Sequence, residues 1–282
     1  MSLEALEFLA MPFAACLILV GIHAYLGIHV LARGVIFVDI ALAQIAALGT
    51  TTAFLAGYEL DGAPAYFFSL GFTFVGATVF ALSRRLRERI PQEAFIGIAY
   101  AVAAAAAILF VDKAPHGAEH IKYILVGNLL WVSKAHVALI AVIYSALGVF
   151  HYIFRKQFLG LSFEHKKGGP TSFKAVGWDL LFYLSFGFVI TSSVQIAGVL
   201  VVFSFLIVPA VFAALFTKSV GRRLLVSWSL GFVVSVLGIS ASYFLDLPTG
   251  AAVVVTFGVI LALGLAARSV AARIGVPAVS EG

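Results

Sequence analysis

The sequence predicts an all-α protein, a polytopic bundle of transmembrane helices, from its composition, its hydropathy and the lengths of its apolar runs. Of the 282 residues, 62% are hydrophobic and 11% are charged, whereas a soluble domain carries about 25% charged residues. With a mean hydropathy of +1.10, the chain has too few charged groups to cover a surface in water. This composition excludes an ordinary soluble enzyme, a disordered chain and a fibrous repeat.

Apolar runs long enough to cross a bilayer, which takes about 20 residues in a helix, follow one another along the chain. Turn residues separate them, such as Gly62-Ala63-Pro64 before the third run. We predict about nine spans, with eight possible, in a single transmembrane domain over residues 1–282. The predicted spans are 8–32, 35–57, 64–83, 94–111, 134–154, 177–194, 196–217, 224–245 and 249–267.

The distribution of positive charge predicts the orientation. Of the 18 Lys and Arg residues, all but Lys113, Lys122 and Lys134 fall in loops on one side of the predicted bundle. The positive-inside rule makes that side cytoplasmic. The N-terminus is then outside and the C-terminus inside, in a multi-pass protein of the cell inner (plasma) membrane that is surrounded by lipid. Because the loops account for the net charge of +5, we expect no nucleic-acid partner.

Several motifs that would indicate an enzyme are missing from the sequence. It contains no G-x-x-x-x-G-K-[ST] phosphate loop, no H-E-x-x-H and no G-x-S-x-G. The single cysteine, Cys16, cannot form an intrachain disulfide. We expect no catalytic residues and no cofactor bound by this chain.

Polar groups inside the second predicted span are candidates for function, because an ionisable group at the centre of a bilayer costs at least ~2.5–3.5 kcal/mol. Asp39 lies near the start of this span and Gln44 lies deeper. Five residues turn an ideal helix by about 140°, so the two side chains border one cavity only if the helix is broken or wraps a channel. The small residues around them allow close helix packing. The alternative is structural: Gln44 bonds to a neighbouring backbone, and Asp39 lies at the interface near Arg33.

The first predicted span contains His23 and His29, six residues apart. Imidazole suits zinc and iron, whereas carboxylate and amide oxygens suit manganese. A lining of His23, His29, Asp39 and Gln44 would therefore suit the transient passage of a divalent first-row metal. The alternative is that both histidines are hydrogen-bonded packing residues.

Three further groups of residues carry weaker signals. In an outer loop, His116, Glu119 and His120 either collect metal or are simply solvated. Pro209 is expected to kink the seventh span. The polar residues 191–195 are expected to form a turn between the sixth and seventh spans.

Five stretches, in this order, resemble a known family. They are GIHAYLGIHVLARGVIFVDIALAQIAALG, PQEAFIGIAYAVAAAAAILF, IKYILVGNLLWVS, QIAGVLVVFSFLIVPAVFAAL and SYFLDLPTGAAVVV. Together they are similar to the integral-membrane permeases of ATP-binding-cassette importers for zinc, manganese and iron. The resemblance extends from Ala15 to about Leu265.

The resemblance implies partners. It implies a homodimer or a paired permease core, two cytoplasmic ATPase subunits that use ATP in place of this chain, and an extracytoplasmic metal-binding protein. Family members have a coupling helix in the cytoplasmic loop before the sixth span. Here that loop is about 155–176, and Ser162 to Val176 would contact the ATPase.

The resemblance also indicates a departure from the family pattern. Many members have an Asp and a His four residues apart in the second span. Here the His position is Gln44, the residue four before it is Ile40, and the acid is Asp39. We hypothesise that His23 and His29 compensate.

The expected function is divalent-metal import by alternating access, powered by a separate ATPase. The alternatives are a permease for a metal chelate, a gradient-driven secondary transporter, and an intramembrane enzyme with a fixed metal.

Overall fold

The computed structural model describes residues 3–60, 62–86, 89–111, 127, 129–164 and 173–273, and every regular element within them is helical. The chain divides into two compact units. Unit 1 comprises Met1–Leu31, Val126–Tyr144 and Ile196–Gly282, and unit 2 comprises Ala32–Leu125 and Ser145–Gln195.

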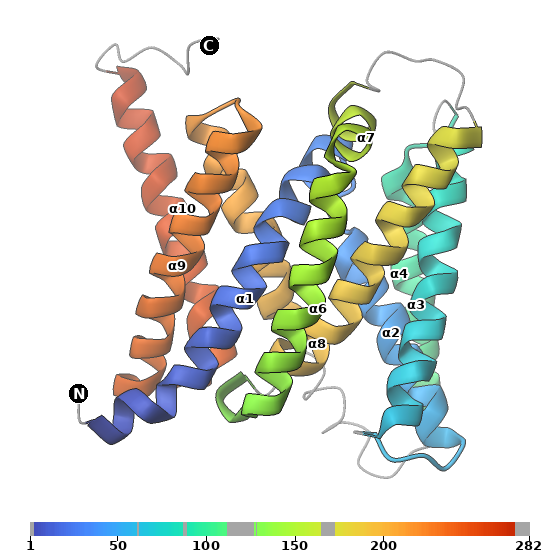
Figure 1. The fold of residues 1–282 in the computed structure, drawn as a ribbon, viewed down its shortest axis with the longest axis horizontal. Helices are drawn as coiled ribbons and strands as arrows, with labels where there is room; N and C mark the ends of the chain where they lie inside the picture. The colour runs from blue at the N-terminus through green and yellow to red at the C-terminus, as the bar shows by residue number, and fades with distance from the viewer. Residues whose placement is uncertain are drawn as a thin grey trace. The chain divides into compact units, whose positions relative to one another are not determined.

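Unit 1 contains most of the first helix, the start of α6, the second part of α8 and two further helices (Figure 1). The helices α9 and α10 pack side by side, and a Cβ on Gly238 would lie 2.8 Å from the Cα of Val253. The turn between these two helices is capped by Ser242, whose hydroxyl donates to the carbonyl of Leu247 over 2.7 Å. The bounds are α1 Leu3–Arg33, η2 Leu129–Trp131, α6 Lys134–Ile153, α8 Phe173–Phe216, α9 Val220–Leu245 and α10 Thr249–Arg273.

Unit 2 contains three helices that pack together, with the second part of α6, the first part of α8 and three short helical elements. The helix α2 packs against α3 and α4. A Cβ on Gly49 would lie 2.8 Å from the Cα of Ser69, and the alanines of α2 are mostly buried. The small residues therefore permit the close packing that the sequence predicted. The bounds are α2 Val38–Leu55, α3 Ala63–Ser83, η1 Arg84–Leu86, α4 Gln92–Val111, α7 Arg155–Leu159 and η3 Gly160–Glu164.

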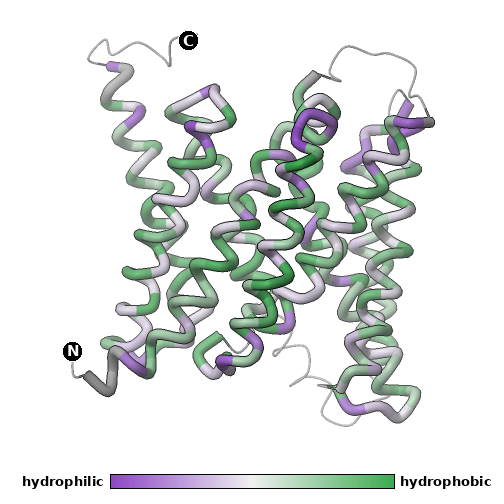
Figure 2. Tube along the Cα trace, viewed as in Figure 1, coloured by the Kyte–Doolittle hydropathy of each residue, from purple (hydrophilic) through white to green (hydrophobic). Residues whose placement is uncertain are grey.

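The prediction of a polytopic transmembrane helical protein is confirmed. The described residues contain 8 helices long and apolar enough to cross a membrane. Hydrophobic residues follow the lengths of these helices, and most hydrophilic residues gather near their ends (Figure 2). The number is eight because the sixth candidate, Lys174–Phe216, combines the sixth and seventh predicted spans.

The helix α8 is too long for a single crossing. It has 44 residues, which at 1.5 Å per residue is roughly 65 Å, about twice the hydrocarbon thickness. It is interrupted at Gly198, where φ is 77° and ψ is 161°. This conformation is open essentially to glycine alone. In unit 1, Gly127 packs directly on this break, because a Cβ on Gly127 would lie 2.3 Å from the nitrogen of Gly198.

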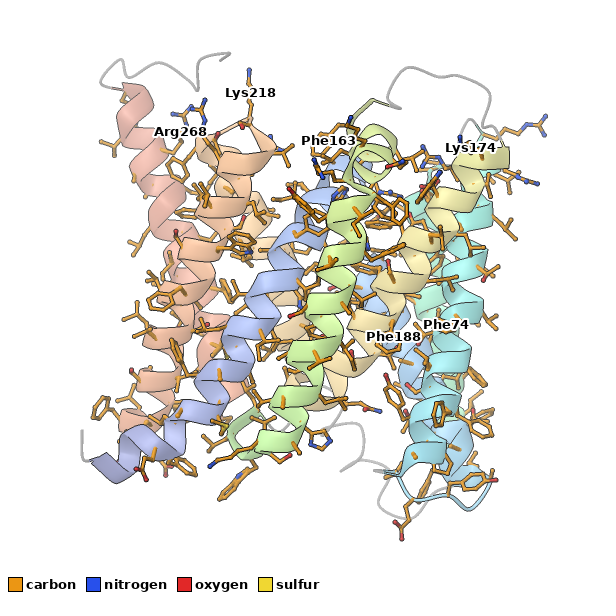
Figure 3. All side chains as sticks on the ribbon, viewed as in Figure 1. Phe74, Phe163, Lys174, Phe188, Lys218 and Arg268 are labelled. Atoms are coloured by element: carbon orange, nitrogen blue, oxygen red, sulfur yellow. The ribbon has the colours of Figure 1, made fainter. Side chains whose placement is uncertain are left out.

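The expectation of a turn at residues 191–195 was wrong. These residues continue α8 as a helix. The hydroxyl of Ser193 donates to the carbonyl of Val189 over 2.7 Å, and Thr191 donates to the hydroxyl of Thr73 on α3 over 2.9 Å. The nearby side chains of Phe74 and Phe188 lie at the same level of unit 2 (Figure 3). Polar side chains that bond back to their own helix do not interrupt it.

Replacing Gly198 with alanine should destabilise the protein by about 1–3 kcal/mol, because the added Cβ is not tolerated at this φ and ψ. The melting temperature in detergent would report the loss. The matched control is Gly258→Ala in α10, where the added Cβ meets nothing within 4 Å. Equal melting temperatures for the two variants would contradict the role of the break.

Candidate translocation site

His23 is fully buried in α1, within unit 1. Its Nδ1 lies 2.8 Å from the carbonyl oxygen of Leu19, one turn earlier. The bond is satisfied when Nδ1 carries the proton and donates it, which leaves a lone pair on Nε2. Nε2 has no hydrogen-bond partner in the part of the chain that the structure describes. Metal-binding histidines commonly have this arrangement, in which one ring nitrogen donates to a carbonyl and the other faces the ion.

His29 is also fully buried in unit 1, and its environment is more aromatic. Its ring meets Tyr25 edge to face, with 4.6 Å between the ring centroids. Six positions on a helix place His23 and His29 about 120° apart around the axis. The two imidazoles therefore point in different directions from α1, as the sequence indicated.

Asp39 lies in the first turn of α2, in unit 2, and is 1% exposed. A helix N-terminus favours negative charge, and the backbone N–H groups of Asp39 and Ile40 lie beside the carboxylate. Even so, neither carboxylate oxygen makes a hydrogen bond of regular geometry with any described residue. Gln44 lies half-buried further along α2. A buried carboxylate in this setting is costly unless a proton or a cation joins it.

Glu93 is a second acid near the start of α2 that the sequence interpretation missed. It belongs to the first turn of α4, and its Oε1 accepts the N–H of Phe37 over 3.1 Å. Phe37 is the residue that precedes α2, so Glu93 caps that helix from a neighbouring one. The available signal was an acid two positions after Pro91, at the beginning of a predicted span.

The four predicted site residues belong to different units: His23 and His29 to unit 1, Asp39 and Gln44 to unit 2. Within the described residues, no three His, Cys, Asp or Glu side chains form a group that could hold a metal ion. The proposed outer-loop residues His116, Glu119 and His120 lie outside the described part of the chain. The four site residues therefore remain a prediction.

A buried ionic network near the end of α1 was also missed. Arg33 and Arg84 both pair with the carboxylate of Asp179 in α8. All three belong to unit 2, and all three side chains are at most 7% exposed. The signal was present, since Asp179 is an ionisable residue inside the predicted span 177–194.

Several basic residues lie together at one end within each unit. In unit 1, Lys218 and Arg268 lie at the same end (Figure 3). In unit 2, the network joins the end of α1, the end of α3 and the start of α8. The assignment of this side to the cytoplasm stays a prediction.

The eight membrane-spanning candidates define the chain as a polytopic α-helical membrane protein. The chain belongs to the ABC 3 transport family, whose profile matches residues 5–268. It is thus the membrane-spanning permease of an ATP-binding-cassette transporter, as the five sequence stretches implied.

Individual relatives cover most of the chain. A "Probable iron transport system membrane protein" of Haemophilus influenzae is 28% identical over 269 residues, which are 95% of this chain and 96% of that protein. The "Manganese transport system membrane protein MntC" of Listeria innocua is 25% identical over 251 residues, 85% of this chain and 83% of that protein. A solved structure titled "PsaBC from Streptococcus pneumoniae in complex with Fab" matches with a TM-score of 0.75 at 20% identity, covering 93% of each chain. That likeness shows a shared fold.

The substitution Asp39→Asn should leave the metal-free protein as stable or up to about 1–3 kcal/mol more stable, because it removes a buried charge that has no ionic partner among the described residues. Melting temperatures measured with a chelator present would show this. The control is Asp246→Asn, at an exposed position whose φ of 52° asparagine tolerates. A clear fall in melting temperature for Asp39→Asn alone would mean that the carboxylate has a stabilising partner.

Proposed function

We propose that this chain is the permease of an importer that moves a divalent metal cation, zinc, manganese or iron, into the cell. The observation that carries the proposal is the family match over residues 5–268. Relatives that align with most of the chain are named for iron and manganese transport. A phosphate loop is absent from the sequence, so separate ATPase subunits supply the energy, and the permease works by alternating access.

The translocation station is proposed to involve His23, His29, Asp39 and Gln44. The lone pair on Nε2 of His23 and the carboxylate of Asp39 are the two groups best prepared to receive a cation. Nitrogen and oxygen ligands together suit first-row divalent metals. A transport site must bind weakly enough to release its ion, so an incomplete ligand set is suited to transient contact.

The proposed orientation places the basic ends of both units in the cytoplasm of the inner (plasma) membrane. The ATPase would then meet the segment Ser162 to Val176, of which residues 165–172 lie outside the described part of the chain. Ser162 and Val176 are themselves buried, whereas Lys174 is exposed. Lys174 is therefore the better surface contact. A second copy of the permease and an extracytoplasmic metal-binding protein complete the assembly.

The central experiment measures ATP hydrolysis by the complex of permease, ATPase and binding protein in liposomes. Manganese, ferrous iron and zinc ions are compared with a ferric chelate. We expect one or more free ions to stimulate hydrolysis and to enter the liposomes, while the chelate does neither. Stimulation by the chelate alone would favour a chelate permease, and uptake without the ATPase would favour a secondary transporter.

The double variant His23→Gln and His29→Gln should lower uptake of the transported ion roughly tenfold or more, because metal sites lose at least this much when their imidazoles are disturbed. Radioactive metal uptake in liposomes measures the effect. His136→Gln is the control, since His136 is exposed at the start of α6. Uptake equal to wild type in the double variant would remove the histidines from the proposed station.

A further inference from the structure

The carboxylate of Asp179 joins three segments of unit 2. Its Oδ1 accepts a hydrogen bond from Arg33 Nη1 over 2.8 Å, and its Oδ2 accepts one from Arg84 Nη1. Arg33 ends α1, Arg84 follows α3 directly, and Asp179 lies near the start of α8. Because each carboxylate oxygen serves a different arginine, a single side chain holds the ends of three helices together.

Arg33 also connects these three helix ends to a fourth segment, η3. Its Nε donates to the hydroxyl of Ser162 over 2.9 Å, while its guanidinium carbon lies 3.8 Å from the centroid of the Phe182 ring. The guanidinium is planar and its donors have fixed directions. Arg33 therefore fixes the position of Ser162 relative to Asp179, whereas the three donors of a lysine lie on one freely rotating nitrogen and fix no such geometry.

Ser162 belongs to η3, the π-helical turn Gly160–Glu164. Such turns are rare and are frequently found at functional sites. The preceding helix, α7, is anchored to the spans of unit 2 by Phe158, which is fully buried. The ring of Phe158 stacks on His151 of α6 at 4.3 Å between centroids, and meets Trp178 of α8 edge to face at 5.7 Å. The described start of the coupling loop is thus attached to the spans of unit 2 at two residues. Phe158 makes the apolar attachment through its ring contacts, and Ser162 makes the polar one through Arg33.

Stability alone does not account for the network. Buried ion pairs are often no more stabilising than apolar residues of similar volume, because removing charges from water is costly. Among the described residues, the two arginines and one aspartate also leave a surplus positive charge in a buried place. What the network provides that an apolar contact does not is a fixed geometry between the segments it joins.

We propose that Asp179, with Arg33, Arg84 and Ser162, transmits movement of the coupling loop to the ends of α1, α3 and α8. Asp179 is then a positioning residue, which acts on the cargo through the helices it holds. The inference rests on the proposed ATP-driven function. Pulling or pushing on η3 displaces Arg33 through Ser162, and Asp179 carries the displacement to α3 and α8.

The test uses two mild variants, because Asp179→Asn leaves two buried arginines without a counter-charge and threatens folding. Ser162→Ala removes the link between η3 and Arg33. Arg33→Lys keeps the charge but loses the planar fork that holds Ser162 and Asp179 in one fixed geometry. Arg85→Lys is the matched control, since Arg85 is the exposed neighbour of Arg84. The full complex in liposomes is assayed for metal transported per ATP hydrolysed, with manganese, ferrous iron or zinc as the probe, together with basal hydrolysis and melting temperature.

In both mild variants we expect the metal transported per ATP to fall about fivefold or more, with a melting temperature close to wild type. The control should couple normally. Normal coupling in both variants would overturn the inference while leaving the proposed function intact, and so would a coupling loss matched by an equal fall in melting temperature in every variant. If wild type shows no metal-stimulated hydrolysis, the proposed function fails and this inference fails with it.

Discussion

Hydrocarbon offers no hydrogen-bond partners, and this constraint governs almost every polar side chain in the described spans. Hydroxyl groups meet it by bonding back to a carbonyl one turn earlier, as Thr51 does to Ala47 over 2.8 Å and Ser235 does to Gly231 over 2.7 Å. Such hydroxyl groups need no hydrogen-bond partner from the surroundings, and they leave the helix intact. Ionisable groups have no such local solution, so each one inside a span demands a separate explanation.

The ionisable groups of this chain meet the constraint in two ways. Asp179 is satisfied on both oxygens by arginines, and a carboxylate that is already neutralised by fixed cations is a poor ligand for a passing metal. Asp39, by contrast, is equally buried but makes no regular hydrogen bond with the described residues. The two carboxylates therefore suit different roles in the proposed mechanism. The carboxylate of Asp179, paired with arginines, suits the transmission of movement. The carboxylate of Asp39, which has no ionic partner among the described residues, suits transient ion binding.

The sequence could predict the features that depend on local residues, but not the contacts that join distant ones. Apolar runs fix the helices because each must span the same thickness, and all nine runs coincide with helices of the structure. The boundary between the sixth and seventh runs was assigned to the polar residues around Ser193, whereas the break is at Gly198, because back-bonding hydroxyls do not end a helix. Asp179 was detectable as a charge within a span, but its partners Arg33 and Arg84 are 146 and 95 residues away. No local pattern specifies contacts at such separations.

The proposed cargo carboxylate, Asp39, and the proposed coupling network lie close together along the chain within unit 2. Arg33 ends α1 and Asp39 lies in the first turn of α2, with the turn at Gly34, where φ is 69°, between them. Glu93 holds the N–H of Phe37 and so fixes the second half of this connection to α4. A displacement of Arg33 by the coupling loop therefore reaches the first turn of α2 through five residues of backbone and one cap. Under the proposed mechanism, ATP-driven movement needs no long chain of contacts to alter the surroundings of Asp39, since the network and the carboxylate share one short connection.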